Sequence, residues 1–216
     1  MDMVEFWTFS SANGIILDAE MRDNISRYVY ELSYWNEKGK MISRKDMDNI
    51  LERHILHSLS ILKYIDIPQK AYVLDIGTGG GLPGIPVKIA RPDLRMTLID
   101  SISKKAKMTE MFADHTGLHN LKVVKERAEI FSEKNRNKFD KVIARAVAPS
   151  EKLITWSMPA IKKSGSWHFL KGGDLEEEIN DVKKKYPNLK YNVRELDLIG
   201  FDWFKENDKK LISFEF

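Results

Sequence analysis

A glycine-rich loop after an apolar segment is the part of this sequence best suited to chemistry. The segment Val73–Ile76 runs into Gly77, and further glycines stand at 79, 80, 81 and 84 before the next apolar stretch. Glycine lets the backbone pass close to a ligand where any Cβ would clash. A helix that begins after such a loop points N–H groups toward negative or polar ligand groups. The loop therefore indicates a site for a nucleotide-like ligand.

The spacing of the glycines is compatible with two ligand classes. Residues 79–84 match G-x-G-x-x-G, and an acidic residue follows about 20 positions on, as in dinucleotide-binding proteins. The first glycine after the strand is Gly77, however, and the sixth position counted from it is Leu82. From Asp75 the pattern is D-x-G-x-G-x-G, a form that holds S-adenosylmethionine. The register favours S-adenosylmethionine, and an NAD-dependent oxidoreductase remains the alternative.

Polar residues at the ends of later apolar segments extend this site. Asp100 ends the segment Thr97–Asp100, where a carboxylate can accept hydrogen bonds from both ribose hydroxyls, although the same residue could cap a helix. Residues 127–129 follow the next segment, where an adenine would lie. Arg145 ends the fourth segment and is expected to face the ligand crevice.

A parallel sheet is needed to bring these strand ends together. After Pro68, short apolar runs alternate with amphipathic segments. We expect strands at 72–76, 96–99, 121–124, 142–144 and 167–170, and helices at 85–90, 104–115, 151–161 and 175–186. Segments 193–198 and 211–216 are expected to form a final antiparallel pair at the sheet edge. The alternation predicts an α/β fold with a doubly wound, mostly parallel, seven-stranded sheet.

The first part of the chain has helical periodicity. Residues 16–36 and 43–64 carry apolar side chains at spacings of three and four, which predicts two amphipathic helices. We expect residues 1–66 to form an N-terminal helical cap that packs with residues 67–216 as one compact unit. We expect that His54 and His57 do not both lie on the buried stripe, and that His54 makes a structural hydrogen bond.

Composition narrows the class of protein. The 216 residues carry a net charge of +3, but residues 100–171 hold 15 Lys and Arg against 8 Asp and Glu. The rest of the chain holds 20 against 24, so a polyanionic partner and an ordinary solvated lysine surface are both compatible with the charge pattern. The chain has no cysteine, no apolar run of about 18 residues and no secretory signal at its start. We expect a cytoplasmic protein without disulfides, a metal site or a membrane segment.

Several motifs, in order along residues 35–172, resemble those of one family. The chain is similar to the bacterial small-subunit (16S) ribosomal RNA guanine-N7 methyltransferases, historically called glucose-inhibited division protein B. The matching pieces are Trp35-Asn36, Glu52–Leu59, Leu74–Pro86, Leu98–Ser101, Lys104-Lys105, Asn120, Arg127–Glu129, Phe139-Asp140, Arg145-Ala146 and Leu170–Gly172. Two differences from the family's usual pattern are His57, where an Asp is more usual, and Lys105, where an Arg is more usual.

The resemblance implies a class I, Rossmann-like methyltransferase domain over residues 67–216. S-adenosylmethionine would donate a methyl group to N7 of a guanine in 16S ribosomal RNA and leave as S-adenosylhomocysteine. By motif position the cofactor would lie along Gly77, Gly79 and Leu82, its ribose on Asp100, and its adenine between Ala128 and Glu129, with Arg145 facing the methyl-transfer pocket. Guanine N7 has a free lone pair, so no general base is required and no catalytic residue is assigned.

The partner implied by the resemblance is 16S ribosomal RNA, the small ribosomal subunit or an assembly intermediate of it. Lys104, Lys105 and Lys171 are the candidate RNA-binding residues, since lysines in the basic segment can contact phosphates. A non-catalytic RNA- or nucleotide-binding protein on a methyltransferase scaffold is the second alternative.

Overall fold

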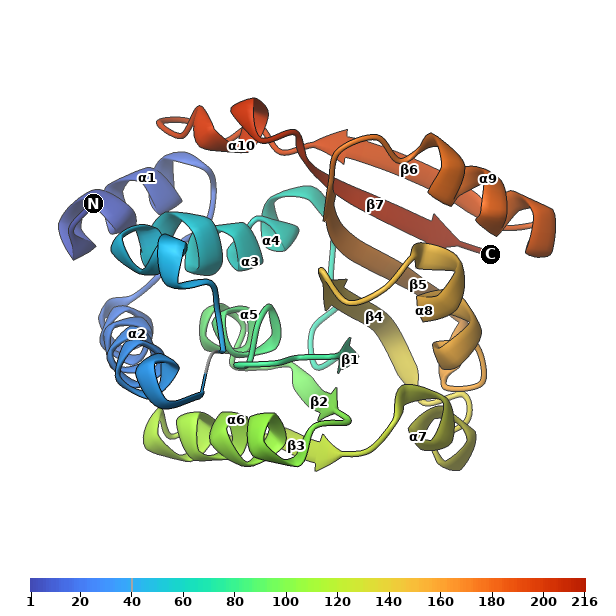
Figure 1. The fold of residues 1–216 in the computed structure, drawn as a ribbon, viewed down its shortest axis with the longest axis horizontal. Helices are drawn as coiled ribbons and strands as arrows, with labels where there is room; N and C mark the ends of the chain where they lie inside the picture. The colour runs from blue at the N-terminus through green and yellow to red at the C-terminus, as the bar shows by residue number, and fades with distance from the viewer. Residues whose placement is uncertain (40) are drawn as a thin grey trace.

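A seven-stranded sheet in the order β3-β2-β1-β4-β5-β7-β6 runs through the molecule (Figure 1). The computed structural model describes residues 1–39 and 41–216. Strands β1 to β5 pair in parallel, and β7 pairs antiparallel with both β5 and β6. The strands are β1 (Tyr72–Ile76), β2 (Arg95–Asp100), β3 (Leu121–Lys125), β4 (Phe139–Arg145), β5 (Ile161–Gly172), β6 (Lys190–Glu195) and β7 (Lys209–Glu215). The predicted mostly parallel α/β fold with its antiparallel edge pair is confirmed.

Helices cover both faces of the sheet (Figure 1). One face carries α5 (Gly84–Ala90) and α6 (Ser103–His115), on which α2 (Ala19–Gly39) packs, and α1 (Met3–Ala12) lies against the helical segment of residues 51–56. The other face carries α7 (Ala128–Lys134), α8 (Ser150–Ser157) and α9 (Glu176–Lys185). In the described part of the chain, no helix is both long and apolar enough to cross a bilayer.

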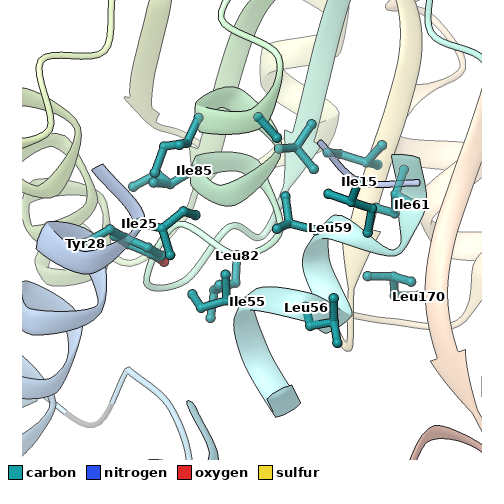
Figure 2. Packing of buried hydrophobic residues seen from close by; sticks show 14 of the residues in the cluster. Ile15, Ile25, Tyr28, Ile55, Leu56, Leu59, Ile61, Leu82, Ile85 and Leu170 are labelled. Atoms are coloured by element: carbon teal, nitrogen blue, oxygen red, sulfur yellow. The ribbon is translucent and has the colours of Figure 1, made fainter. Parts of the chain in front are cut away.

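Two apolar cores lie on opposite sides of the sheet. Successive side chains of a strand point to opposite faces, so Val73 of β1 joins one core and Leu74 joins the other. The first core also buries the N-terminal helices. Figure 2 shows Ile25 and Tyr28 of α2 and Ile55 near Leu82 and Ile85, at and just after the glycine loop. The N-terminal helices therefore rest directly on the segment that forms the predicted ligand site.

The segment expected to be one helix over 43–64 is divided. It consists of η1 (Arg44–Asn49), a 3₁₀ helix, η2 (Leu51–Leu56), a π-helix, and the short α3 (His57–Leu59) and α4 (Ile61–Tyr64). His54 and His57 are both buried, each 7% exposed. The prediction that they could not share the buried side is wrong, because side chains three residues apart lie on the same face of a helix.

Other differences from the predicted elements are at their ends. Helix α8 ends at Ser157, four residues before the predicted end, because β5 already begins at Ile161. Helices α1, α7 and the four-residue α10 (Trp203–Glu206) were not predicted. Helices α7 and α10 carry too few apolar positions to show a period of 3.6, and the apolar residues of α1 lie on all its sides.

Candidate functional site

The glycine loop between β1 and α5 is fixed by hydrogen bonds from two neighbouring elements. The backbone N–H groups of Gly77 and Thr78 both donate to the carbonyl of Ile99 in β2, at 2.8 and 3.0 Å. The Thr109 hydroxyl of α6 donates to the Gly79 carbonyl at 2.7 Å. The Tyr28 hydroxyl of α2 donates to the Gly80 carbonyl at 2.8 Å. The loop is therefore held in one position before any ligand binds.

Gly77 is required at its position for two reasons. Its φ of +67° lies in the left-handed region that side chains disfavour. A Cβ added to Gly77 would also lie 2.7 Å from both methyl groups of Val147, which belongs to the loop after β4. The backbone of β1 thus meets the β4 loop at a contact that only glycine permits.

Asp75 lies buried beneath the loop and holds its shape. Its Oδ2 accepts hydrogen bonds from the Thr78 hydroxyl at 2.7 Å and from the Gly84 N–H at 2.9 Å. Burial raises the pKa of this carboxyl to about 7. Its partners all belong to the loop or to the start of α5, so Asp75 is a support of the loop and not a lining residue of a cavity.

Asp100, at the end of β2, faces the same loop from the other side. Its Oδ2 accepts from the Gly79 N–H at 2.9 Å and its Oδ1 from the Ile102 N–H at 2.8 Å. An ionised carboxylate has about four lone-pair sites, so these two bonds leave acceptor capacity for hydroxyl groups. The second of these bonds satisfies an N–H at the start of α6. Asp100 can therefore cap this helix and still accept hydrogen bonds from the hydroxyls of a ribose.

A cavity of about 330 Å³, here the first cavity, opens at the carboxyl ends of β1 to β4. Its floor is apolar and its rim is polar. The lining residues are Ile76, Gly77, Ile99, Asp100, Ser101, Ile102, Lys105, Glu126, Arg127, Ala128, Glu129, Ala146, Val147 and Trp156. Ligands of doubly wound sheets bind at this edge, and pockets for small ligands begin at about 300 Å³.

The predicted cofactor residues divide between this cavity and its surroundings. Gly77, Asp100, Ala128 and Glu129 line the first cavity. Gly79 lies behind Asp100, to which its N–H is bonded. Leu82 is 5% exposed and packs in the core beside the loop.

Arg145 lies in a second cavity, also of about 330 Å³, on the other side of Ala146. Its Nη2 is 2.7 Å from Nδ1 of His54, and its Nη1 faces the carbonyls of Arg53 and His54 at 3.3 and 3.4 Å. Burial lowers the pKa of Arg145 to about 10, which leaves the guanidinium charged at neutral pH. Ala146 lines both cavities, so they are neighbours.

The three predicted RNA-binding lysines have different surroundings. Lys105 lines the first cavity. The amine of Lys104 donates to the Lys38 carbonyl at 2.9 Å and joins α6 to α2. Lys171 lines the second cavity, where its amine forms an ion pair with Glu178 at 2.5 Å and donates to the Ala148 carbonyl at 2.6 Å.

Several lining residues were not predicted from the sequence. Trp156 is half-buried and lines the first cavity, whereas Trp167 and Phe169 are fully buried. Arg53, Trp203 and Lys209 line the second cavity. No local spacing marks these three residues, because they come from segments far apart in the chain.

The residues of the first cavity fit a nucleoside with a charged tail. Gly77 lines the cavity without a side chain, and Asp100 has acceptor capacity for two hydroxyls. Ile76, Ile99 and Ala128 offer apolar surface for a ring. Among residues 1–39 and 41–216, no three His, Asp or Glu side chains are grouped closely enough to hold a metal ion.

Comparison of the sequence with known proteins also indicates a methyltransferase. The profile of the family described as "GidB: rRNA small subunit methyltransferase G" matches residues 21–200. The ribosomal RNA small subunit methyltransferase G of Flavobacterium johnsoniae is 42% identical over 153 residues, which cover 68% of this chain and 71% of the relative. That of Flavobacterium psychrophilum is 41% identical over 167 residues, covering 74% and 77%.

Solved structures are similar in fold. A SAM-dependent methyltransferase from Aquifex aeolicus aligns with a TM-score of 0.57 at 13% identity, over 80% of this chain and 97% of that chain. A precorrin-6y C5,15-methyltransferase from Geobacter metallireducens aligns with a TM-score of 0.56, also at 13% identity, over 81% and 90%. At such low identity the likeness shows the fold alone, which is that of class I methyltransferases.

Proposed function

The chain belongs to the rRNA small subunit methyltransferase G family, and from this premise we propose that it transfers a methyl group from S-adenosylmethionine to N7 of a guanine in 16S ribosomal RNA. The observation that carries the proposal is the first cavity, in which Asp100 and the glycine loop face one another at the carboxyl end of the sheet. Neither the NAD-dependent oxidoreductase nor the non-catalytic alternative has support from the relatives.

The residues of the first cavity would hold the cofactor in an extended arrangement. Asp100 would accept hydrogen bonds from the ribose hydroxyls, and Ala128 and Glu129 would lie beside the adenine. Gly77 and Gly79 would contact the cofactor through backbone, with Leu82 supporting the loop from the core. When bound, S-adenosylmethionine supplies an electrophilic methyl carbon. Arg145 would act from the second cavity, which lies across Ala146 from the cofactor and would face the acceptor guanine.

The reaction needs positioning more than acid-base chemistry. The N7 lone pair of guanine forms a bond to the methyl carbon while the carbon–sulfur bond breaks, which gives a cationic N7-methylguanine and S-adenosylhomocysteine. No proton is lost, so no general base is assigned. The contribution of the chain is to hold the two reactants in line and to exclude water.

The partner in this proposal is 16S ribosomal RNA, free or within a small subunit or its assembly intermediate, in the cytoplasm. Lys105, which lines the first cavity, Lys104 on the same helix and Lys171, which lines the second cavity, would contact phosphates. We further propose that residues 1–66, as a helical cap, and the methyltransferase domain over 67–216 act as one unit. The Tyr28 hydroxyl bonded to the Gly80 carbonyl supports this, since it joins the cap to the cofactor loop.

Calorimetric titration with S-adenosylmethionine and with NAD, followed by methylation of 16S ribosomal RNA that lacks the modification, tests the function. We expect binding of S-adenosylmethionine alone, and methyl transfer to a guanine. The variant Asp100→Ala should bind about tenfold or more weakly, because hydrogen bonds to a charged group are lost. The matched control is Asp114→Ala, an exposed carboxylate of α6 that should leave binding unchanged.

The possible contrary results separate the alternatives. Binding of NAD in place of S-adenosylmethionine would support an oxidoreductase and overturn the proposal. Binding of S-adenosylmethionine without transfer to ribosomal RNA or small subunits would support a non-catalytic protein.

A further inference from the structure

Two buried imidazole rings in the second cavity have nitrogens without partners. In the described residues, Nε2 of His54 and Nε2 of His57 make no hydrogen bond, and each residue is 7% exposed. Both rings line the cavity that also contains Arg145 and Trp203. Buried polar atoms in native proteins are nearly always paired. Two unpaired ring nitrogens in one cavity therefore indicate a ligand that pairs with them.

The proton of His54 is assigned from its neighbours. Its Nδ1 lies 2.7 Å from Nη2 of Arg145, which can only donate, so Nδ1 is an acceptor. Burial and the nearby Arg145 lower the pKa of His54 to about 3, which keeps the ring neutral. The single proton therefore lies on Nε2. The Oδ2 atom of Asp46 is 3.7 Å away, too far for a hydrogen bond, so Nε2–H remains an available donor.

His57 has the opposite polarity at its Nε2. Burial holds its pKa well below the usual value, and its ring hydrogen-bonds to the backbone carbonyl of Arg53. A carbonyl only accepts, and Nε2 is the nitrogen without a partner, so Nδ1–H makes that bond. Nε2 of His57 is therefore an acceptor. The cavity thus offers one donor from His54 and one acceptor from His57.

An aromatic ring with two cations close to it forms another wall of this cavity. The Arg53 guanidinium lies 5.5 Å and the Lys209 ammonium 5.3 Å from the centre of the Trp203 ring. Trp203 is half-buried, and its ring contacts that of His57 edge to face at 6.2 Å. Exposed aromatic rings flanked by Arg and Lys are the usual platform for a nucleobase and its phosphates.

We propose that the second cavity holds the acceptor guanine after it leaves its stack in the RNA, with the base on Trp203 and its keto edge paired to His54 and His57. Guanine presents the O6 acceptor next to the N1–H donor, which matches a donor and an acceptor. Adenine presents the reverse order. Ala146 lines both cavities, so a base in the second lies beside the reactive part of the first. This inference rests on the proposed methyltransferase function.

Single-turnover methylation of small subunits or 16S RNA tests the platform. Trp203→Ala should lower the rate at subsaturating RNA by about five- to 100-fold, the range expected for loss of base stacking. Trp203→Phe should retain most of the rate. S-adenosylmethionine affinity and the thermal midpoint of Trp203→Phe should stay at wild-type values. The matched control is Trp7→Ala, an exposed tryptophan of α1 that stacks on Arg22 and lines neither cavity.

The pairing of the base with His54 and His57 is tested by changing the RNA and not the protein, so the result does not depend on whether a protein variant folds. Synthetic RNA carries inosine or 2-aminopurine at the methylated position. Inosine keeps O6 and N1–H, and it should be methylated within about tenfold of guanine. In 2-aminopurine O6 is absent and N1 is an acceptor, so the rate should fall by about 100-fold or more, because each buried polar group left unpaired carries a desolvation penalty.

The outcomes are distinguishable. Wild-type activity in Trp203→Ala, or equal methylation of inosine and 2-aminopurine, overturns the base site and leaves the methyltransferase function standing. Absence of methyl transfer by the wild-type protein overturns the proposed function, and the base site falls with it.

Discussion

The two neighbouring cavities differ in charge and in how the chain builds them. The first is lined by three carboxylates, those of Asp100, Glu126 and Glu129, and by two cationic side chains. The second is lined by four Arg and Lys side chains, those of residues 53, 145, 171 and 209, and by the single carboxylate Asp46. The first suits a ligand with hydroxyls and a positive charge, whereas the second suits part of a polyanion. Under the proposed function, cofactor and RNA would therefore be separated by electrostatics as well as by the wall at Ala146.

The largest effect should follow from closing the first cavity at Gly77. Gly77→Ala combines a side chain at φ +67° with an overlap at 2.7 Å from Val147. Left-handed strain and overpacking each cost about 1–3 kcal/mol, so S-adenosylmethionine affinity should fall roughly 100-fold in calorimetry. RNA binding through the second cavity should change little.

Gly117→Ala is the matched control for this change. Gly117 also has a positive φ, +62°, but a Cβ there meets nothing within 4 Å. It should lower stability through strain while leaving cofactor affinity intact. Equal loss of affinity in both variants would show that backbone strain, and not the contact with Val147, limits the first cavity.

The first cavity could be predicted from the sequence because its residues follow strand ends. Each of β1 to β4 is a short apolar run, and the residue types just beyond it decide the lining. A parallel sheet brings these ends to one edge, so Gly77, Asp100 and Ala128 could be placed together without a structure. In the structure all three line the first cavity, and the hydrogen bond from the Gly79 N–H to Asp100 joins the glycine loop to the end of β2.

The second cavity could not be predicted in the same way. His54 and His57 both line it, but the apolar spacing of their segment shows neither the π-helix at Leu51–Leu56 nor that their ring nitrogens are left unpaired. Trp203 and Lys209 come from the C-terminal part, and their position depends on the antiparallel pairing of β7 with β5. The placement of Arg145 in the second cavity also depends on its bond to His54, which is a tertiary contact.

The pH dependence of the free energy of unfolding should reveal a property of the second cavity, with a smaller effect than that of Gly77→Ala on the first. The pKa of His54 is lowered to about 3 in the folded chain, against about 6.5 in an unfolded one. Below pH 6.5 the unfolded chain binds the proton first, so stability is complete above that pH and is lost progressively down to about pH 3. His54→Gln should therefore flatten the fall of unfolding free energy by up to about 1.4 kcal/mol per pH unit in urea titrations at pH 7 to 4.5.

His168→Gln is the comparison for this pH effect. His168 also has a pKa lowered to about 3 by burial, but its ring lies between the hydroxyls of Ser166 and Ser213, outside both cavities. Both variants should flatten the acid dependence, and only His54→Gln should reduce methylation. If the two reduced methylation equally, the second cavity would have no special part in the reaction.

The smallest effect should come from the substitution of single lysines. These variants test whether the phosphates of the RNA lie close to the first cavity. Lys105→Gln removes a charge at the rim of the first cavity, so RNA affinity should fall a few-fold and the slope of log affinity against log salt should decrease by about one. Lys104→Gln should do less, because the Lys104 amine is already bonded to the Lys38 carbonyl. Lys184→Gln, on the exposed face of α9, should leave the slope unchanged.

Filter binding at several salt concentrations measures the RNA affinity of all three variants. An equal change of slope in Lys105→Gln and Lys184→Gln would mean that RNA binding depends on the net charge of the protein and not on the position of Lys105 at the first cavity.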